Sequence, residues 1–344
     1  MIRSVLLLLR VSTVSAADYS TTLDGGFVTL GDGKLMKAAV SPEHGGELAS
    51  LEVYFDGEWR ELLYRARDYS ESDGWRGKAP FLWPAVGMTL DPGGIGRGFT
   101  VDGQFFPMPG HGFARDRAWR LAHHGADDGG AFVTLVLESD SGTRAHYPFD
   151  FRISVGYHIA GDRLSIEYTI QAGADNVGPM PFSIGNHVTF RAPLIEGANS
   201  GSLIFRNEFP SQLIRGDDRT FSGQVVPSPY RGEQSLSVLP VRQAVGLGGV
   251  DGPAELTVID HSGLSLNLRH EASAEPAPPA IRFNLWADTE EGFFSPEPWL
   301  GTQNSLNNGA GLVRLDPGES WRWTIEIKPG RAATSGADPG EKSE

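Results

Sequence analysis

The chain has 344 residues, a formal net charge of -14 and no cysteine, and it is rich in glycine (44) and proline (23). Because glycine and proline disfavour helix interiors, this composition excludes a coiled coil and argues against a helical bundle. The missing cysteine excludes disulfides, thiolate metal sites and a cysteine nucleophile, and the acidic charge argues against nucleic acid and anionic lipid as partners.

The first 17 residues have the pattern of a secretory signal peptide. Arg3 supplies a short cationic start, residues 5–9 begin an apolar run, and Val14-Ser15-Ala16 fits a small-x-small cleavage site. The apolar run is too short to span a membrane. We therefore expect an exported protein, periplasmic or extracellular, with no membrane contact after cleavage. A misassigned start and a disordered leader are the alternatives.

Short strands separated by turns are predicted for the body of the chain. Apolar and polar residues alternate, or β-forming residues dominate, in five segments: 131–137, 151–157, 164–170, 264–268 and 321–327. A hairpin turn is expected at residues 160–163. Strands with one apolar and one polar face are typical of antiparallel sandwiches. The prediction is an all-β fold, a large antiparallel β-sandwich in a single domain over residues 18–330, with a disordered tail at 331–344.

Familiar catalytic and cofactor motifs are missing from the sequence. It has no P-loop, no HExxH and no GxSxG, and the glycine cluster at 93–98 does not match a dinucleotide fingerprint. We therefore expect neither a cofactor nor a metal. Three other segments carry candidate site residues.

His111 is the first candidate. Gly110 and Gly112 flank it, so the backbone can approach a ligand closely at this point. The alternative is an ordinary histidine in a turn.

His187 is the second candidate, in the segment 181–190. Read as a strand of period two, this segment places His187, Thr189 and Arg191 on one face, away from the core. An imidazole in such a place titrates near neutrality and can donate or accept a proton. The alternative is an exposed strand histidine without a function.

Glu297 is the third candidate, and it lies between Pro296 and Pro298. Both proline rings restrict the backbone, so the carboxylate suits a preorganised base, and apolar surroundings would raise its pKa. The alternative is an incidental glutamate in a proline-rich surface loop.

Together these segments resemble the aldose 1-epimerase (galactose mutarotase) family, most of all its bacterial branch with HGFAR and GGHPAF-like motifs. The resemblance covers most of residues 30–325 in the expected order. It is carried by residues 39–48 and 80–87, HGFARD at 111–116, GNHVTF at 185–190 and EPWLG at 297–301. It implies a β-supersandwich and the interconversion of α and β anomers of a free aldose by acid-base ring opening and closure.

The resemblance also implies roles for individual residues. His187 is similar by position to the general acid of the family, Glu297 to its general base, and His111 to a second histidine that binds and polarises the sugar. Arg115 of HGFAR is a further candidate for substrate binding. The chemistry implied is an acid-base pair on opposite sides of the sugar ring, without metal, nucleotide or covalent intermediate.

Three tryptophans are candidates for contact with the C–H groups of a sugar: Trp83, Trp286 and Trp299. Packing in the core is the alternative for each of them. The expected partner is a monosaccharide or a similar small molecule, and neither the sugar nor the oligomeric state follows from the sequence.

Two positions depart from the family pattern. Met88 stands where the family commonly has a sugar-binding arginine, with Arg97 nearby, and only Gln243 and Asp251 are candidates for a substrate-binding aspartate. Rival functions are therefore a catalytically weak carbohydrate-binding or sugar-sensing protein, and a hexose-6-phosphate epimerase with Arg115 or Arg97 on the phosphate. Polysaccharide cleavage is a further alternative without a supporting motif.

Overall fold

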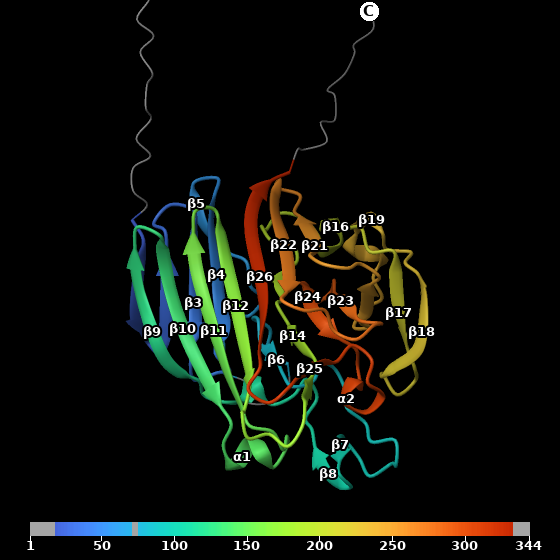
Figure 1. Cartoon of the computed structure of the whole chain (residues 1–344). Coiled ribbons are helices and arrows are strands. Elements are labelled where there is room, and N and C mark those ends of the chain that lie inside the picture. Colours follow the sequence, from blue (N-terminus) through green and yellow to red (C-terminus); the bar gives the residue numbers. More distant parts are fainter. Residues whose placement is uncertain (1–17, 71–74, 333–344) are drawn as a thin grey trace, which may run out of the picture.

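The computed structural model describes residues 18–70 and 75–332, and antiparallel strands make up most of it (Figure 1). The predicted signal peptide at 1–17 lies outside the described residues, as do residues 333–344 of the predicted tail. The predicted start of that tail at residue 331 is wrong, because Arg331 is the last residue of strand β26 (Ser320–Arg331). In the described ranges, no helix is long and apolar enough to cross a membrane. The all-β prediction is confirmed.

Nine strands form the largest sheet. Their order is β19 (Gly232–Ser235), β16 (Ile204–Asn207), β21 (Ala254–Ile259), β22 (Leu264–Ala272), β26 (Ser320–Arg331), β12 (Arg163–Ala172), β11 (Phe151–Ala160), β10 (Gly130–Glu138) and β9 (Arg120–Asp127). All five segments predicted as strands lie in this sheet.

Eight strands form the second sheet. Their order is β18 (Phe221–Pro227), β17 (Ser211–Arg215), β20 (Val245–Gly248), β23 (Ile281–Asp288), β24 (Phe293–Gly301), β14 (Ile184–Asn186) and β6 (Phe81–Leu82), with β15 (Phe190–Arg191) paired to β24 outside this order.

The remaining strands form one five-stranded sheet and two ribbons. The sheet runs in chain order through β1 (Ser20–Asp24), β2 (Phe27–Gly31), β3 (Met36–Ser41), β4 (Glu47–Phe55) and β5 (Glu58–Glu61). The ribbons pair β7 (Gly98–Val101) with β8 (Gln104–Pro107), and β13 (Met180–Phe182) with β25 (Val313–Leu315). The helices are single turns: α1 (Ser141–Arg144), α2 (Ser305–Asn308) and the 3-10 turns Ala114–Asp116, Ser200–Ser202 and Leu236–Val238.

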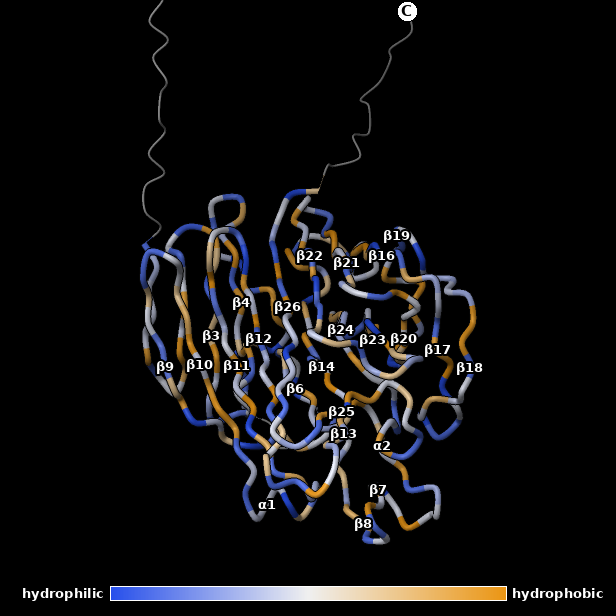
Figure 2. Tube along the Cα trace, in the orientation of Figure 1, coloured by the Kyte–Doolittle hydropathy of each residue, from blue (hydrophilic) through white to orange (hydrophobic). Residues whose placement is uncertain are grey.

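The hairpin of β11 and β12 shows why these sequences form strands. Ala160 pairs with Arg163 across a turn at Gly161, whose φ of 58° suits glycine, so the predicted turn is confirmed. Every second residue of β12 is buried and those between are at least partly exposed. Figure 2 shows hydrophobic and hydrophilic residues interspersed along the strands rather than gathered in separate blocks.

The nine-stranded sheet is backed by the two other sheets. Its β9–β12 half packs on the five-stranded sheet, and its other half packs on the eight-stranded one. Ring contacts across the second interface include Phe205 on Phe294, 5.8 Å between centroids, and His270 on Phe283, 5.0 Å. One hydrophobic cluster extends from Val28 to Ile327, so it reaches into all three sheets.

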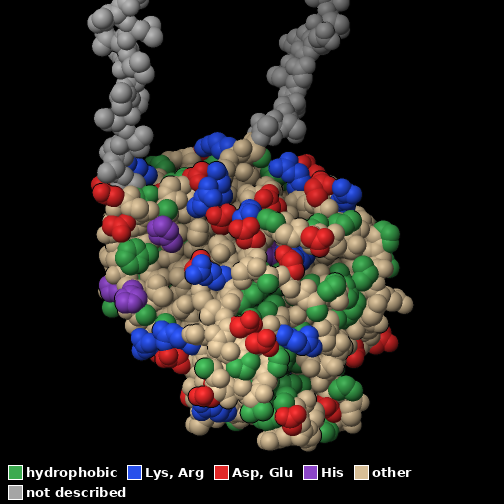
Figure 3. Space-filling model, in the orientation of Figure 1, with side chains coloured by type: hydrophobic (Ala, Val, Ile, Leu, Met, Phe, Trp, Pro, Cys, Tyr) green, Lys and Arg blue, Asp and Glu red, His purple; other side chains and the backbone are tan. Residues whose placement is uncertain are grey.

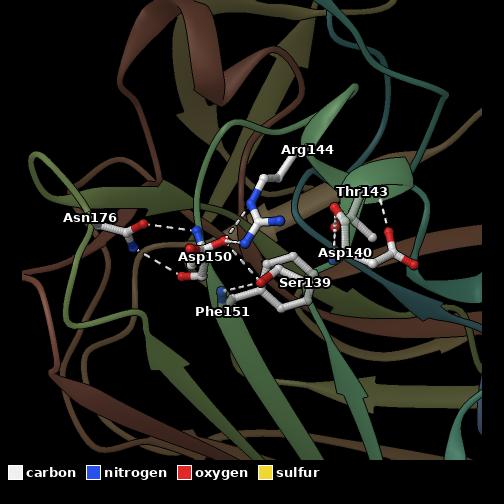
Figure 4. A network of polar contacts seen from close by, with 7 residues as sticks. All are labelled: Ser139, Asp140, Thr143, Arg144, Asp150, Phe151 and Asn176. Atoms are coloured by element: carbon white, nitrogen blue, oxygen red, sulfur yellow. Dashed lines mark hydrogen bonds and ion pairs between the residues drawn. The ribbon is translucent and has the colours of Figure 1, made fainter.

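Polar contacts fix the connection between β10 and β11 (Figure 4). Asp140 caps α1 by accepting from the backbone N–H of Thr143 at 2.7 Å. Arg144 donates to the Asp150 carboxylate at 2.7 Å, and Asn176 bonds both the N–H and the carbonyl of Asp150. The network therefore ties this connection to the one that follows β12.

Acidic and basic side chains are interspersed on the face of the molecule shown in Figure 3. Several of them pair on the surface, for example Arg152 with Glu138 and Arg163 with Glu326. On this face neither acidic nor basic side chains gather in one large patch.

Candidate active site

A cavity of about 650 Å³ opens over the eight-stranded sheet. Small-molecule sites are typically 300–1,000 Å³, so a monosaccharide has ample room. Strands β17, β23 and β24 and the segments after β8 and β14 supply its walls. His111, His187 and Glu297 all line it, so the fold brings together three candidates that are far apart in the sequence.

His111 is held by an unusual backbone conformation. Its φ is 66°, and Gly112 follows with φ 72°, where a Cβ would collide with the carbonyl of Trp83. The N–H of Gly87 donates to Nδ1 of His111 at 3.2 Å, which leaves the hydrogen of the neutral ring on Nε2. Burial, followed by the neighbouring His187 and the charges of Arg115 and Arg215, holds the pKa of His111 well below its usual range. His111 is therefore a neutral donor.

His187 follows the last residue of β14, and its N–H donates to the carbonyl of Pro80 at 2.9 Å. The predicted face shared with Thr189 and Arg191 is wrong, because the strand ends at Asn186 and Thr189 is fully buried while Arg191 is exposed. The His187 side chain is only 7% exposed and lines the cavity. Burial, and secondarily the charge of Arg115, lower the pKa of His187 to about 3.

Glu297 lies in the middle of β24, so the alternative of a glutamate in a proline-rich surface loop is wrong. Its Oε1 accepts from Nδ2 of Asn284 at 2.7 Å, and its Oε2 accepts from the indole N–H of Trp299 at 3.0 Å. The side chain is 1% exposed. Burial raises the pKa of Glu297 to about 8, while the two N–H donors and the charge of Arg215 oppose this shift.

The two titratable groups lie next to each other. Nε2 of His187 is 3.7 Å from Oε2 of Glu297. A sugar ring cannot fit between them, so the expected placement on opposite sides of a ring is wrong for this geometry. Both groups instead face the same region of the cavity. With pKa values of about 3 and about 8, the pair holds one proton across the intervening pH range.

Four arginines line the cavity: Arg115, Arg215, Arg219 and Arg242. Arg115 donates to the carbonyl of Gly110 at 3.1 Å, and Arg242 pairs with Asp288 and, at 3.4 Å, with Glu291. Arg219 is exposed in the turn between β17 and β18.

The three predicted tryptophans have different positions. Trp286 lines the cavity, with its ring 5.5 Å from that of His187. Trp83 does not, because it is fully buried among Tyr147 and Phe151 in the core. Trp299 is also fully buried, and it contributes its N–H to Glu297 rather than a face to the cavity. Contact with a sugar is therefore not available to Trp83 or Trp299.

The structure also shows where the residues that depart from the family pattern, and their candidate substitutes, lie. Met88 is half-buried outside the cavity lining, and Arg97 is exposed and outside it. Gln243 lines the cavity, whereas Asp251 is exposed elsewhere. Neither Arg97 nor Asp251 can therefore complete the site.

Sequence reasoning missed Trp75, Asn284 and Arg215. Trp75 stands edge-to-face against Trp286, 4.7 Å between centroids. A signal existed for Asn284, because it interrupts the apolar run Phe283-Asn284-Leu285, where a buried amide requires a partner. No local signal marked Trp75 or Arg215.

The chain is thus an antiparallel β-sandwich with a small-molecule-sized cavity in which an imidazole lies beside a carboxylate. Residues 26–202 match the model of the aldose 1-epimerase family, so the chain belongs to that family.

Individual relatives agree with this assignment. The chromosomal LacX protein of Lactococcus lactis subsp. lactis is 28% identical over 283 residues, 77% of this chain and 85% of LacX. A protein provisionally named glucose-6-phosphate 1-epimerase, from Salmonella typhimurium, is 32% identical over 84 residues, 24% of each chain. The galactose mutarotase related enzyme of Lactobacillus acidophilus has the same fold, with a TM-score of 0.70 and 19% identity over 92% of this chain and 98% of that one.

Proposed function

We propose that this protein is an aldose 1-epimerase that interconverts the α and β anomers of a free aldose. The observation that carries the proposal is the 3.7 Å separation of Nε2 of His187 and Oε2 of Glu297 on the wall of a sugar-sized cavity. Ring opening removes a proton from the anomeric hydroxyl and adds one to the ring oxygen. Both oxygens are bonded to C1, so an acid and a base side by side can reach both of them.

In the resting pair the proton lies on Glu297, because the pKa of Glu297 is raised to about 8 and that of His187 is lowered to about 3. In the proposed reaction this proton first passes to the adjacent Nε2 of His187, so that Glu297 takes the proton of the anomeric hydroxyl while His187 gives one to the ring oxygen. The C1–ring oxygen bond breaks, the aldehyde rotates about the C1–C2 bond, and closure on the other face reverses both transfers. The pair ends with the single proton it started with. Each positioned proton transfer typically contributes a factor of ~10²–10⁴ to the rate.

Neighbouring side chains fit the binding of a sugar. Nε2–H of His111 is a neutral donor for a sugar oxygen, since its Nδ1 already accepts from Gly87. Trp286 and Trp75 offer aromatic surface to C–H groups, and Gln243 offers an amide to hydroxyl groups.

Polarimetry and saturation-transfer NMR on a panel of aldoses test the proposal. The wild-type protein should accelerate mutarotation of at least one aldose, and His187→Asn should lower kcat by ~10²–10⁴. His123→Asn is the matched control, because His123 is an exposed histidine on β9. Calorimetric binding of an aldose without acceleration by folded wild-type protein would contradict an enzyme and favour a carbohydrate-binding protein.

A phosphorylated aldose is the second candidate substrate. Arg115 and Arg219 favour it, because both line the cavity and guanidinium groups bind phosphate in a bidentate manner. The provisional name of the Salmonella typhimurium relative points the same way. Comparing kcat/KM for an aldose and its 6-phosphate on one protein preparation decides between the two substrates.

Export is part of the proposal and is supported by the pattern of residues 1–17. Mass spectrometry of the protein from a secreting host should find a new N-terminus near Ala17. An intact Met1 on protein retained inside the cell would contradict export.

A further inference from the structure

We propose that Arg215 is a positioning residue for the proposed epimerisation: through Asn284 and through its own charge, it holds the Glu297 carboxylate in place and ready to accept a proton. This inference rests on the proposed function and assigns a role to a side chain on a different sheet strand from either reacting group.

Arg215 is the last residue of β17 and is anchored on the inner side of the cavity. With the Gln303 amide oxygen facing the guanidinium, that oxygen accepts from Nε of Arg215 at 2.8 Å. Gln303 is itself buried and packs on Gly87, where a Cβ would lie 2.5 Å from its Cγ. Gly87 precedes Met88, the position where the family commonly has an arginine. Gln303, which bonds the Arg215 guanidinium, therefore packs on the turn that carries this position.

The Asn284 amide connects Arg215 to Glu297. Its Oδ1 accepts from Nη2 of Arg215 at 3.4 Å, and its Nδ2 donates to Oε1 of Glu297 at 2.7 Å. Asn284 lies directly opposite Glu297 in the register of β23 and β24 and is 2% exposed. Because the cation takes the amide oxygen, the amide N–H must face the carboxylate.

Among the described groups around Glu297, Arg215 is the one whose charge lowers the pKa of this carboxyl. From β23 and from β24 itself, Glu297 meets the neutral donors Asn284 and Trp299, and from the end of β14 it meets His187, whose pKa is lowered to about 3. Arg215 on β17 supplies the positive charge that opposes the burial of this carboxylate. Without that charge, the cost of burying the Glu297 carboxylate is offset less, so the protonated form of Glu297 is favoured.

The remaining charged groups act elsewhere. Arg115, from the 3-10 turn after β8, lowers the pKa values of both His111 and His187, and Arg219, beyond the end of β17, acts on Arg215. Arg242 is paired with Asp288 and Glu291 at the rim. Substitution of Arg215 should therefore change the titration of Glu297 more than substitution of any of these three.

The test combines a titration with kinetics on the full chain. In Arg215→Met, ¹³C NMR of the Glu297 carboxyl should show its titration moved upward by roughly 1 unit, the size expected from an opposite charge at close range. The alkaline limb of kcat/KM for the aldose should move upward with it, and the plateau should fall by about tenfold or more. Arg215→Lys should keep the limb near its wild-type position, because the charge remains, but should recover only part of the plateau.

Arg206→Met, at an exposed position on β16, is the control for loss of a cation and should leave both readouts unchanged. Circular dichroism verifies that each variant is folded. If Arg215→Met is folded and neither the carboxyl titration nor the alkaline limb moves, the inference is overturned. The NMR titration needs no substrate, so it decides the inference even if the wild-type protein accelerates no aldose and the proposed function fails.

Discussion

The strands β12 and β24 differ in which of their residues are buried. Along β12, buried residues alternate with more exposed ones, so one face packs on the core and the other faces solvent. Along β24, all nine residues are buried, and Ser295 and Glu297 are among them. A buried polar group requires partners, and Glu297 finds them in Asn284 and Trp299. The strand that lines the cavity is therefore recognised by a buried polar side chain with its own hydrogen-bond donors, and not by alternation of buried and exposed residues.

The largest effect should come from the carboxylate of β24. Glu297→Gln is expected to lower kcat for the aldose by ~10²–10⁴ while the protein stays folded, because the amide cannot accept the proton. Glu167→Gln on β12 should leave kcat unchanged, because Glu167 is exposed on the solvent face. Polarimetry of both variants makes the comparison, and equal activities would remove the distinction between the two strands.

The reverse pattern is expected for a core residue of β12. Ile166 is 1% exposed, and truncation of such a side chain typically destabilises by about 2–5 kcal/mol. Ile166→Ala should therefore lower the urea midpoint markedly and leave kcat near wild type at temperatures where the variant is folded. A large loss of kcat with little loss of stability would show that the two strands are not functionally distinct.

The pH dependence of stability gives a third contrast. Burial raises the pKa of Glu297 from its ordinary 4.5 to about 8, so the folded protein binds this proton more tightly than the unfolded chain does. The stability that this group contributes is complete below about pH 4.5 and is lost as pH rises toward 8. The Tm of Glu297→Gln relative to wild type should therefore increase between pH 5 and pH 9. Glu47, whose pKa burial raises to about 7, titrates in both proteins and cancels in the difference.

The smallest effect is expected at a surface ion pair of the nine-stranded sheet. Arg152 on β11 pairs with Glu138 on β10, and both side chains are about half exposed to solvent. Exposed pairs of this kind contribute roughly 0–1 kcal/mol. Arg152→Ala should thus change the unfolding free energy by no more than about that amount and leave activity unchanged, as measured by urea unfolding and polarimetry. A larger loss would mean that exposed charges on β11 matter more than its alternating pattern indicates.

The sequence predicted the sheet of alternating strands better than the sheet that carries the site. Alternation identifies β11 and β12 because solvent on one face imposes it, whereas β24 is buried on both faces and has no such period. Pro296 and Pro298 suggested a loop, yet β24 continues through both of them and keeps its pairing with β23.

The site residues that stand in short sequence motifs were predicted from the sequence. His111, His187 and Glu297 stand in recognisable segments and meet in one cavity. Arg215 and Trp75 could not be predicted, because only the tertiary fold brings them to Glu297 and Trp286. Trp83 and Trp299 could not be told from cavity residues, since an indole suits a core and a sugar site equally well.

The position of β26 has a consequence for how the molecule is made. It is the last strand of the described chain, yet it lies between β12 and β22 in the nine-stranded sheet. During vectorial synthesis, the strands up to β12 and those from β16 to β22 thus emerge before the strand that joins them. Pairings such as Gln171 with Ser320 have a high sequence separation, which slows folding. The sheet is therefore expected to close only after β26 has emerged, later than the hairpin of β11 and β12.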